Sequence, residues 1–183
     1  EKYSQRGRNM EIFYKKSIWF DMDGVLVHYC ADDYAGLQPR YLEAGYFKNL
    51  PADHLMTETC RRLNDEKASD MYVGILSKVN KDSGKYLQQQ ADKTYWLASQ
   101  FTSMPSTFTG TSKARKAMAV LGRQLTEHDI LIDDFNQNLI EWTAAGGCAV
   151  KYGKGQRDSW PGYSIQDLQD AQEIISFLHS ITN

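Results

Sequence analysis

Residues 17–24, Ser-Ile-Trp-Phe-Asp-Met-Asp-Gly, decide the fold of this chain. The stretch opens on a short, mainly apolar run and continues directly into Asp21, Asp23 and Gly24. A continuous apolar run bounded by polar residues is typical of a strand buried in a parallel sheet. Two carboxylates directly after such a strand indicate a site beyond the carboxyl end of the sheet, and the glycine permits the sharp turn that aims both at it.

The same pattern of short apolar runs recurs along the chain. It predicts further strands at residues 71–76, 106–108, 130–132 and 148–150. Helical patterns lie between and after these runs, with a helix beginning near residues 51–53 and others at residues 83–101, 112–121, 136–145 and 164–179. Strand alternating with helix predicts an α/β fold, a doubly wound, Rossmann-like parallel sheet covered on both faces.

Residues 28–50 interrupt this alternation. A loop of this length without secondary structure is uncommon unless it is functional. We therefore expect a small cap inserted after the first strand, while an ordinary loop with packed aromatic residues is the alternative. The predicted division is a core at residues 10–27 and 51–183, a cap at residues 28–50 and a polar N-terminal extension at residues 1–9.

Composition and charge restrict the classes of function. The chain has 183 residues, 42% of them hydrophobic, and a formal net charge of −2, which argues against binding a nucleic acid polymer. No apolar run approaches the ~20 residues that a membrane-spanning helix needs. Cys30, Cys60 and Cys148 are widely spaced, which predicts reduced thiols in a cytoplasmic protein and no zinc site.

A second acidic pair marks the other side of the predicted site. Asp133 and Asp134 directly follow residues 130–132, as the first acidic pair follows its own strand. In a parallel sheet both pairs project into one crevice, where four carboxylates repel one another. A hard cation with oxygen ligands relieves that repulsion, so the sequence predicts Mg²⁺, and a phosphate group that completes its coordination shell.

Two further polar residues stand at element ends on the same side. Ser77 ends the strand at residues 71–76 and can donate a hydrogen bond to a phosphate oxygen, although it also suits a plain strand-end hydroxyl. Lys113 opens a helix after a Gly-Thr-Ser turn, where its ammonium can offset charge on the transferring phosphoryl group. Lys78 and Lys116 are its rivals, and Lys116 lies a helical turn further from the crevice.

The ordered set of motifs resembles that of the haloacid dehalogenase-like phosphohydrolases. The similar stretches are, in order, Asp21-Met22-Asp23-Gly24-Val25, Ile75-Leu76-Ser77, Lys113 and Asp133-Asp134. More narrowly, residues 46–51 and residues 131–139 resemble the small 5'(3')-deoxyribonucleotidases. That family often has Thr-Ser-Pro at the second motif, where this chain has Leu76-Ser77-Lys78, so the resemblance leaves the phosphate contacts and substrate preference open.

The resemblance implies a role for each motif. Asp21 is the nucleophile that forms an acyl phosphate, and Asp23 is the acid that protonates the leaving group and then the base that activates water. Asp21, the backbone carbonyl of Asp23, Asp133 and Asp134 are expected around Mg²⁺. We expect Asp134 to bind the ion directly and Asp133 to act through water. Lys113 offsets charge at the nucleophile.

The expected substrate is a small phosphomonoester, with a nucleoside monophosphate favoured. Gly24, Ser77 and Lys78 are expected at the phosphate. Tyr29, Tyr41 and Phe47 are candidates for stacking on a base, because aromatic rings offer a tolerant stacking face, and packing inside the cap is the alternative.

Other functions fit the same motifs. They are hydrolysis of a sugar phosphate, phosphotransfer to an acceptor other than water, and a non-catalytic protein that binds phosphorylated ligands. The sequence also leaves open whether the chain acts as a homodimer.

Overall fold

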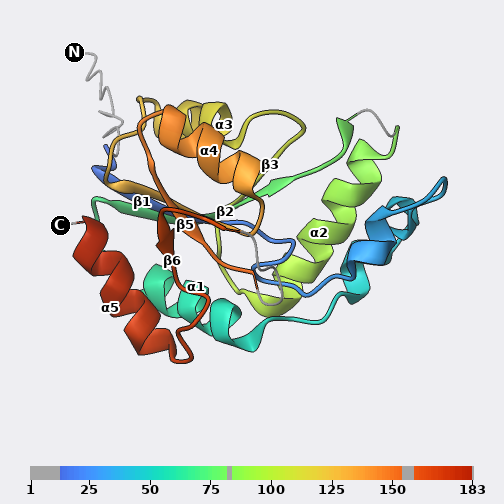
Figure 1. Ribbon diagram of the computed structural model, residues 1–183, viewed down its shortest axis with the longest axis horizontal. Helices are drawn as coiled ribbons and strands as arrows, with labels where there is room; N and C mark the ends of the chain where they lie inside the picture. The colour runs from blue at the N-terminus through green and yellow to red at the C-terminus, as the bar shows by residue number, and fades with distance from the viewer. Residues whose placement is uncertain (1–12, 82–83, 154–158, 183) are drawn as a thin grey trace, which may run out of the picture.

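A six-stranded parallel sheet forms the centre of the molecule (Figure 1). The computed structural model describes residues 13–81, 84–153 and 159–182. The strands lie in the order β3-β2-β1-β4-β5-β6, which confirms the predicted doubly wound α/β fold. Their bounds are β1 Lys16–Phe20, β2 Met71–Lys78, β3 Ser106–Thr109, β4 Asp129–Asp133, β5 Cys148–Lys151 and β6 Tyr163–Ser164.

Helices cover both faces of the sheet. In Figure 1, α1 (His54–Glu66) and α5 (Ala171–Thr182) lie on one face, and α3 (Lys113–Leu121) and α4 (Asn136–Ala144) lie on the other. Successive side chains of a strand point to opposite faces, so Ile18 and Phe20 pack towards α1 and α5 while Trp19 packs towards α3 and α4. Within the described ranges, every helix is too short or too polar to cross a lipid bilayer.

The strand order reverses beside β1. The chain runs from β1 to β2 and β3 in one direction, and β4, β5 and β6 extend the sheet in the other. Such a switch point opens a crevice beyond the carboxyl ends of the strands. The two acidic pairs lie at the carboxyl ends of β1 and β4, which are hydrogen-bonded neighbours, so the topology brings them to this crevice.

Residues 28–50 form three short 3-10 helices beside α2 (Tyr86–Gln100), as Figure 1 shows. Hydrogen bonds tie the segment to α2. The backbone N–H of Gly45 donates to Asp92 at 2.7 Å, and the indole N–H of Trp96 donates to the carbonyl of Leu50 at 2.9 Å. The three 3-10 helices are η1 Ala31–Tyr34, η2 Arg40–Leu42 and η3 Tyr46–Asn49.

The predicted bounds of the last helix were wrong. The sequence pattern predicted a helix from residue 164, but α5 begins at Ala171, and Tyr163–Ser164 forms the edge strand β6. Asp170 sets the start of α5, because its Oδ1 accepts from the backbone N–H groups of Gln172 and Glu173 at 2.8 and 3.1 Å.

Two other predictions fall partly or wholly outside the described residues. The helix predicted at residues 83–101 is α2, which begins at Tyr86, and residue 83 is not described. The polar extension predicted at residues 1–9 lies outside the described ranges.

A buried ion pair anchors the opposite end of the sheet. Asp129, fully buried at the start of β4, accepts from Arg123 at 2.6 and 2.8 Å and from the hydroxyl of Ser17 at 2.7 Å. Burial alone raises the pKa of Asp129, but the hydrogen bonds from Arg123 and Ser17 outweigh it and lower the pKa below its usual value.

Replacing this carboxylate is expected to destabilise the fold. Asp129→Asn leaves the guanidinium of Arg123 without its charged partner, so the free energy of unfolding should fall by about 3–5 kcal/mol. Urea denaturation of the variant measures this. Glu127→Gln, a change of the same kind at an exposed neighbour, is the matched control and should unfold like the wild type. Equal stability of the two variants would refute the anchoring role.

Candidate active site

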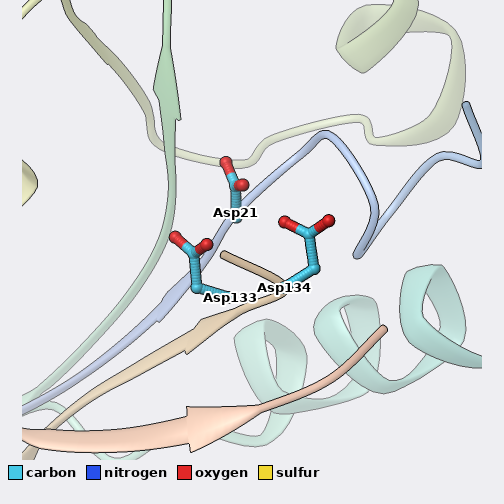
Figure 2. Close-up of side chains that lie close together, drawn as sticks. All are labelled: Asp21, Asp133 and Asp134. Atoms are coloured by element: carbon cyan, nitrogen blue, oxygen red, sulfur yellow. The ribbon is translucent and has the colours of Figure 1, made fainter. Parts of the chain in front are cut away.

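Three carboxylates meet at the carboxyl end of the sheet, as Figure 2 shows. Asp21 follows β1, Asp133 ends β4 and Asp134 comes next along the chain. All three residues are buried, and one oxygen of each lies within 4.8 Å of the others. The structure therefore brings Asp21 of the first predicted pair together with both residues of the second pair, which the sequence placed at the end of a separate strand.

Lys113 stands between two of these carboxylates. It is the first residue of α3, whose N-cap is Ser112, and it is 1% exposed. Its Nζ lies 2.6 Å from both Asp21 Oδ1 and Asp133 Oδ2. Burial alone lowers the pKa of Lys113, but the charges of Asp133 and Asp21 outweigh it and raise the pKa, so the side chain is a permanent cation.

Asp133 and Asp134 have different surroundings. Asp133 accepts hydrogen bonds from the side chains of Lys113 and Asn138 and from the backbone N–H of Phe135. Asp134 accepts from the hydroxyl of Tyr29 at 2.9 Å. Burial, followed by the charge of Asp133, raises the pKa of Asp134 to about 7.

The nucleophile predicted from the sequence is also in an unusual state. Burial raises the pKa of Asp21 well above its usual value, although the ammonium of Lys113 opposes that shift. Asp21 Oδ1 accepts a hydrogen bond from the backbone N–H of Met22 at 2.7 Å and also contacts the ammonium of Lys113. Oδ2 accepts no hydrogen bond from the part of the chain that the structure describes.

Gly24 allows the loop after β1, residues 21–27, to approach Asp134 closely. Its φ is 79°, in the left-handed region, and its N–H donates to the carbonyl of Val27 at 2.9 Å. A Cβ at this position would stand inside the van der Waals contact distance of the Asp134 carboxylate. A side chain here would therefore push Asp134 out of the cluster in addition to straining the backbone.

Asp23 lies beside the three carboxylates but has a cation of its own. Its Oδ2 is 2.7 Å from the Nζ of Lys93, a buried lysine of α2. The same ammonium donates to the hydroxyl of Ser77 at 2.9 Å and to the carbonyl of Lys78 at 2.7 Å. Ser77 is fully buried, so the structure places both predicted residues of the second motif next to this ion pair.

The three predicted aromatic residues differ in their exposure to a ligand. The hydroxyl of Tyr29 is bonded to Asp134, and Phe47 is 2% exposed and lies under Lys93, with the ammonium 4.3 Å from the ring centroid. Tyr41 stacks on Tyr34, with ring centroids 4.6 Å apart. Among the three, Tyr41 is the one that borders an open cavity without being held by a charged group.

Sequence reasoning missed several residues of the site. Lys93 recurs at helical spacing with the buried residues Gln89, Trp96 and Leu97, which was the available signal for its inward direction. Asn138 lies one turn into α4 and bonds Asp133. Lys151, fully buried at the end of β5, donates to the backbone carbonyl of Asp134 and to Asn136.

The donor set suits a hard divalent cation. Three buried carboxylates supply oxygen atoms within a few ångström of one another, and neither histidine nor cysteine joins them in the described cluster. Oxygen ligands of this kind suit Mg²⁺ or Ca²⁺ rather than zinc or copper. The raised pKa values of Asp21 and Asp134 express the same excess of negative charge that a cation would neutralise.

Comparison with known proteins identifies the fold. No protein-family model matches the sequence, and no curated protein matches it. Among solved structures, D,D-heptose 1,7-bisphosphate phosphatase from B. bronchiseptica, complexed with magnesium and phosphate, is 13% identical with a TM-score of 0.59, over 88% of this chain and 99% of that one. A haloacid dehalogenase (HAD) family hydrolase from Deinococcus radiodurans R1, with bound phosphate and sodium, is 14% identical with a TM-score of 0.59, over 93% and 97% of the two chains.

A third structure gives the same result. A HAD-superfamily hydrolase from Ehrlichia chaffeensis is 14% identical with a TM-score of 0.55, over 91% of this chain and 97% of that one. The chain thus has the fold of the HAD-superfamily hydrolases over almost its whole length. At such low identity the similarity is one of fold.

Cation binding is expected to strengthen as the pH rises. The pKa of Asp134 is raised to about 7, so below pH 7 a proton competes with the cation for this carboxylate. The increase in Tm produced by Mg²⁺ should therefore be larger at pH 8 than at pH 5.5. A Mg²⁺ concentration of about 100 times the Kd should add about 2.7 kcal/mol of stability. Sodium chloride at matched ionic strength is the control, and an effect independent of pH would contradict the expectation.

Gly24→Ala is expected to destabilise the protein and to disturb the carboxylate cluster. Backbone strain contributes about 1–3 kcal/mol, and displacement of Asp134 adds to it. Gly36→Ala is the matched control, because Gly36 has a φ of 83° but open space around it. Thermal unfolding with and without Mg²⁺ should show a larger loss for Gly24→Ala and no stabilisation by the cation. Indistinguishable behaviour of the two variants would contradict this.

Proposed function

We propose that this chain is a Mg²⁺-dependent phosphomonoester hydrolase that works through an aspartyl phosphate on Asp21. The observation that carries the proposal is the environment of Asp21. A buried carboxylate has one oxygen fixed by Lys113 and by the Met22 N–H, while Oδ2 accepts no hydrogen bond from the described chain. A fixed carboxylate with one oxygen available is suited to attack on phosphorus.

Asp21, Asp134 and Asp133 are the side chains proposed to hold Mg²⁺, together with the backbone carbonyl of Asp23. Asp134 suits direct coordination, because Asp133 already accepts from Lys113, Asn138 and the Phe135 N–H. When bound, Mg²⁺ would offset the repulsion between the carboxylates and a phosphate dianion.

The residues of the chain account for both half-reactions. In the first, Asp21 Oδ2 forms a bond to phosphorus, the ester P–O bond breaks, and Asp23 gives its proton to the departing alkoxide. In the second, Asp23 takes a proton from a water molecule, whose oxygen attacks the aspartyl phosphate. Inorganic phosphate leaves and Asp21 is restored.

Lys113 and Ser77 are proposed to hold the phosphoryl group. Lys113 is a permanent cation next to the attacking carboxylate, where it can stabilise charge that develops on the equatorial oxygens. The Ser77 oxygen accepts from Lys93, so its own proton is available for a phosphate oxygen. Lys78, the last residue of β2, lines the cavity beside Asp23.

The leaving group is proposed to lie in a cavity beside Asp23. This cavity of about 320 Å³ is lined by Asp23, Tyr34, Tyr41, Phe47, Asn80 and Gln89, among others. Its volume is at the lower end of small-molecule sites, which span ~300–1,000 Å³. Residues 28–50 supply the aromatic wall, so we propose that this segment acts as a cap.

A nucleoside monophosphate is the substrate class that this cavity favours. The stacked pair Tyr34 and Tyr41 offers a flat aromatic face, and the amides of Asn80 and Gln89 hold Tyr41 in place through hydrogen bonds to its hydroxyl and its backbone carbonyl. A flat heterocycle can stack on this face. This supports a nucleotidase of the 5'(3')-deoxyribonucleotidase kind.

A sugar phosphate is the competing substrate class. Two of the structures that share this fold are D,D-heptose 1,7-bisphosphate phosphatases. The chemistry at Asp21 is the same in both cases. The two classes differ in whether the aromatic face contributes to binding.

Asp21→Asn is expected to abolish phosphate release. Loss of the nucleophile should lower kcat by a factor on the order of 10³ or more. Phosphate release from nucleoside 5'- and 3'-monophosphates, sugar phosphates and p-nitrophenyl phosphate, with Mg²⁺ and with EDTA, measures this. Asp65→Asn, an exposed carboxylate on α1, is the matched control. Full activity of Asp21→Asn, or activity that survives EDTA, would overturn the mechanism.

The same panel identifies the substrate class. Tyr41→Leu removes the aromatic face but keeps apolar bulk, so it should raise KM for nucleotides by about tenfold, which corresponds to the ~1–3 kcal/mol of base stacking. Sugar phosphates should be unaffected. If the wild type prefers sugar phosphates, the mechanism stands and the nucleotidase assignment is wrong.

A further inference from the structure

Lys93 is a buried cation that none of the four sequence motifs contains. It lies on α2, is 1% exposed, and points away from solvent towards Asp23 in the loop after β1. Its Nζ is 2.7 Å from Asp23 Oδ2, 2.9 Å from the hydroxyl of Ser77 and 2.7 Å from the carbonyl of Lys78. An ammonium has three N–H donors, so these three acceptors use all of them.

The burial of this lysine is unfavourable in isolation. Removing an ammonium from water is unfavourable unless a charge partner and hydrogen bonds compensate for the lost hydration. Asp23 supplies the opposite charge, and the ring of Phe47 covers the ammonium at 4.3 Å, in cation–π contact. The side chain is therefore held in one place, and the Asp23 carboxylate is held with it.

The two oxygens of Asp23 are unequal as a result. Oδ2 is bound to Lys93 and lies 3.5 Å from the hydroxyl of Tyr34. Burial, followed by the charge of Asp23, raises the pKa of Tyr34, so this phenol stays protonated and can donate. Oδ1 is buried and has no hydrogen-bond partner among the described residues. The arrangement fixes the Asp23 carboxyl group through Oδ2 and leaves Oδ1 to carry the proton that passes to the leaving group.

A neighbouring residue of α2 fixes the segment that carries the aromatic wall. Asp92, 1% exposed, accepts from the backbone N–H of Gly45 at 2.7 Å and lies 3.5 Å from the ammonium of Lys48. Asp92 and Lys93, consecutive buried residues of α2, therefore hold residues 28–50 and the loop after β1 in fixed positions relative to each other. The position of Asp23 relative to the cavity depends on both.

We propose that Lys93 is a positioning residue that orients Asp23 for proton transfer to the leaving group. This inference rests on the proposed phosphatase function. Lys93 does not bind the phosphate itself, because its three donors already have acceptors within the protein. Lys113, which contacts Asp21, has that task. Loss of Lys93 therefore affects departure of the leaving group more than binding of the phosphoryl group.

Two esters with different leaving groups test this proposal. Benzyl phosphate releases a strongly basic alkoxide that needs a proton, whereas p-nitrophenyl phosphate releases a weakly basic phenolate that does not. The value of kcat/KM reports the steps up to departure of the leaving group, so the later hydrolysis step does not enter. Lys93→Met should lower kcat/KM for benzyl phosphate more than about tenfold, and for p-nitrophenyl phosphate less than about threefold, since general acids contribute about 10²–10⁴-fold.

Matched variants distinguish a positioning role of Lys93 from an effect on folding. Lys116→Met makes the same change on an exposed helical lysine and should leave both values unchanged. In an Asp23→Asn background, Lys93→Met should cause no further loss on benzyl phosphate, because residues that act as a unit are not additive. Lys93→Gln, which keeps a donor, should give the same split between the two esters if the Met variant does not fold.

Each remaining outcome overturns the inference. Equal losses on both esters, in a folded variant, would mean that Lys93 serves the phosphate or the fold, and independent losses from Lys93→Met and Asp23→Asn would mean that it does not act through Asp23. A variant as active as Lys116→Met would mean that Lys93 only packs. These outcomes reject the role of Lys93 and keep the phosphatase, whereas a wild type that releases phosphate from neither ester rejects both.

Discussion

The structure depends on the balance of charge at the carboxyl ends of β1 and β4. Parallel topology forces acidic side chains from two strands into one buried crevice, where water cannot solvate them. Buried lysines of α2, α3 and β5 extend into the same crevice. Each contacts a carboxylate or the backbone of the residues that carry one. The carboxylates are Asp21, Asp23, Asp133 and Asp134, and the lysines are Lys93, Lys113 and Lys151. The remaining excess of negative charge is what a divalent cation neutralises.

This balance explains why the site is divided into two halves. Lys113 bridges Asp21 and Asp133, on the side where we propose that the metal and the phosphoryl group bind. Lys93 holds Asp23, on the side where we propose that the leaving group departs. The two aspartates of one short loop thus have separate cations and separate tasks. The close approach of Gly24 to Asp134 joins the halves, because the loop cannot turn between them with a larger residue.

The aromatic segment has a comparable dependence on α2. Residues 28–50 contain three short 3-10 helices, and their position follows from bonds to Asp92 and Trp96. Short 3-10 turns have little stability of their own, so their placement depends on tertiary contacts. The shape of the cavity beside Asp23 is consequently a property of α2 as much as of the segment itself.

Much of the fold was predictable because it follows from local patterns. Buried parallel strands are short apolar runs, and this signal predicted the positions of β1 to β5. The start of the last helix was predicted too early because residues 164–170 resemble it in composition. In the structure, pairing with β5 makes residues 163–164 the edge strand β6, and the cap at Asp170 sets the start of α5.

The sequence by itself determined the fold class and the residues that meet at the strand ends, because parallel topology sends every strand end to one edge. Only the tertiary structure decided how those residues pair. Lys93 and Lys151 belong to none of the four motifs, and the groups that each one contacts depend on the packing of α2 and β5 against the sheet. The unequal roles of Tyr29, Tyr41 and Phe47 likewise depend on which ring meets a charged group. Pairing of this kind joins residues far apart in the chain, so local sequence patterns hold no record of it.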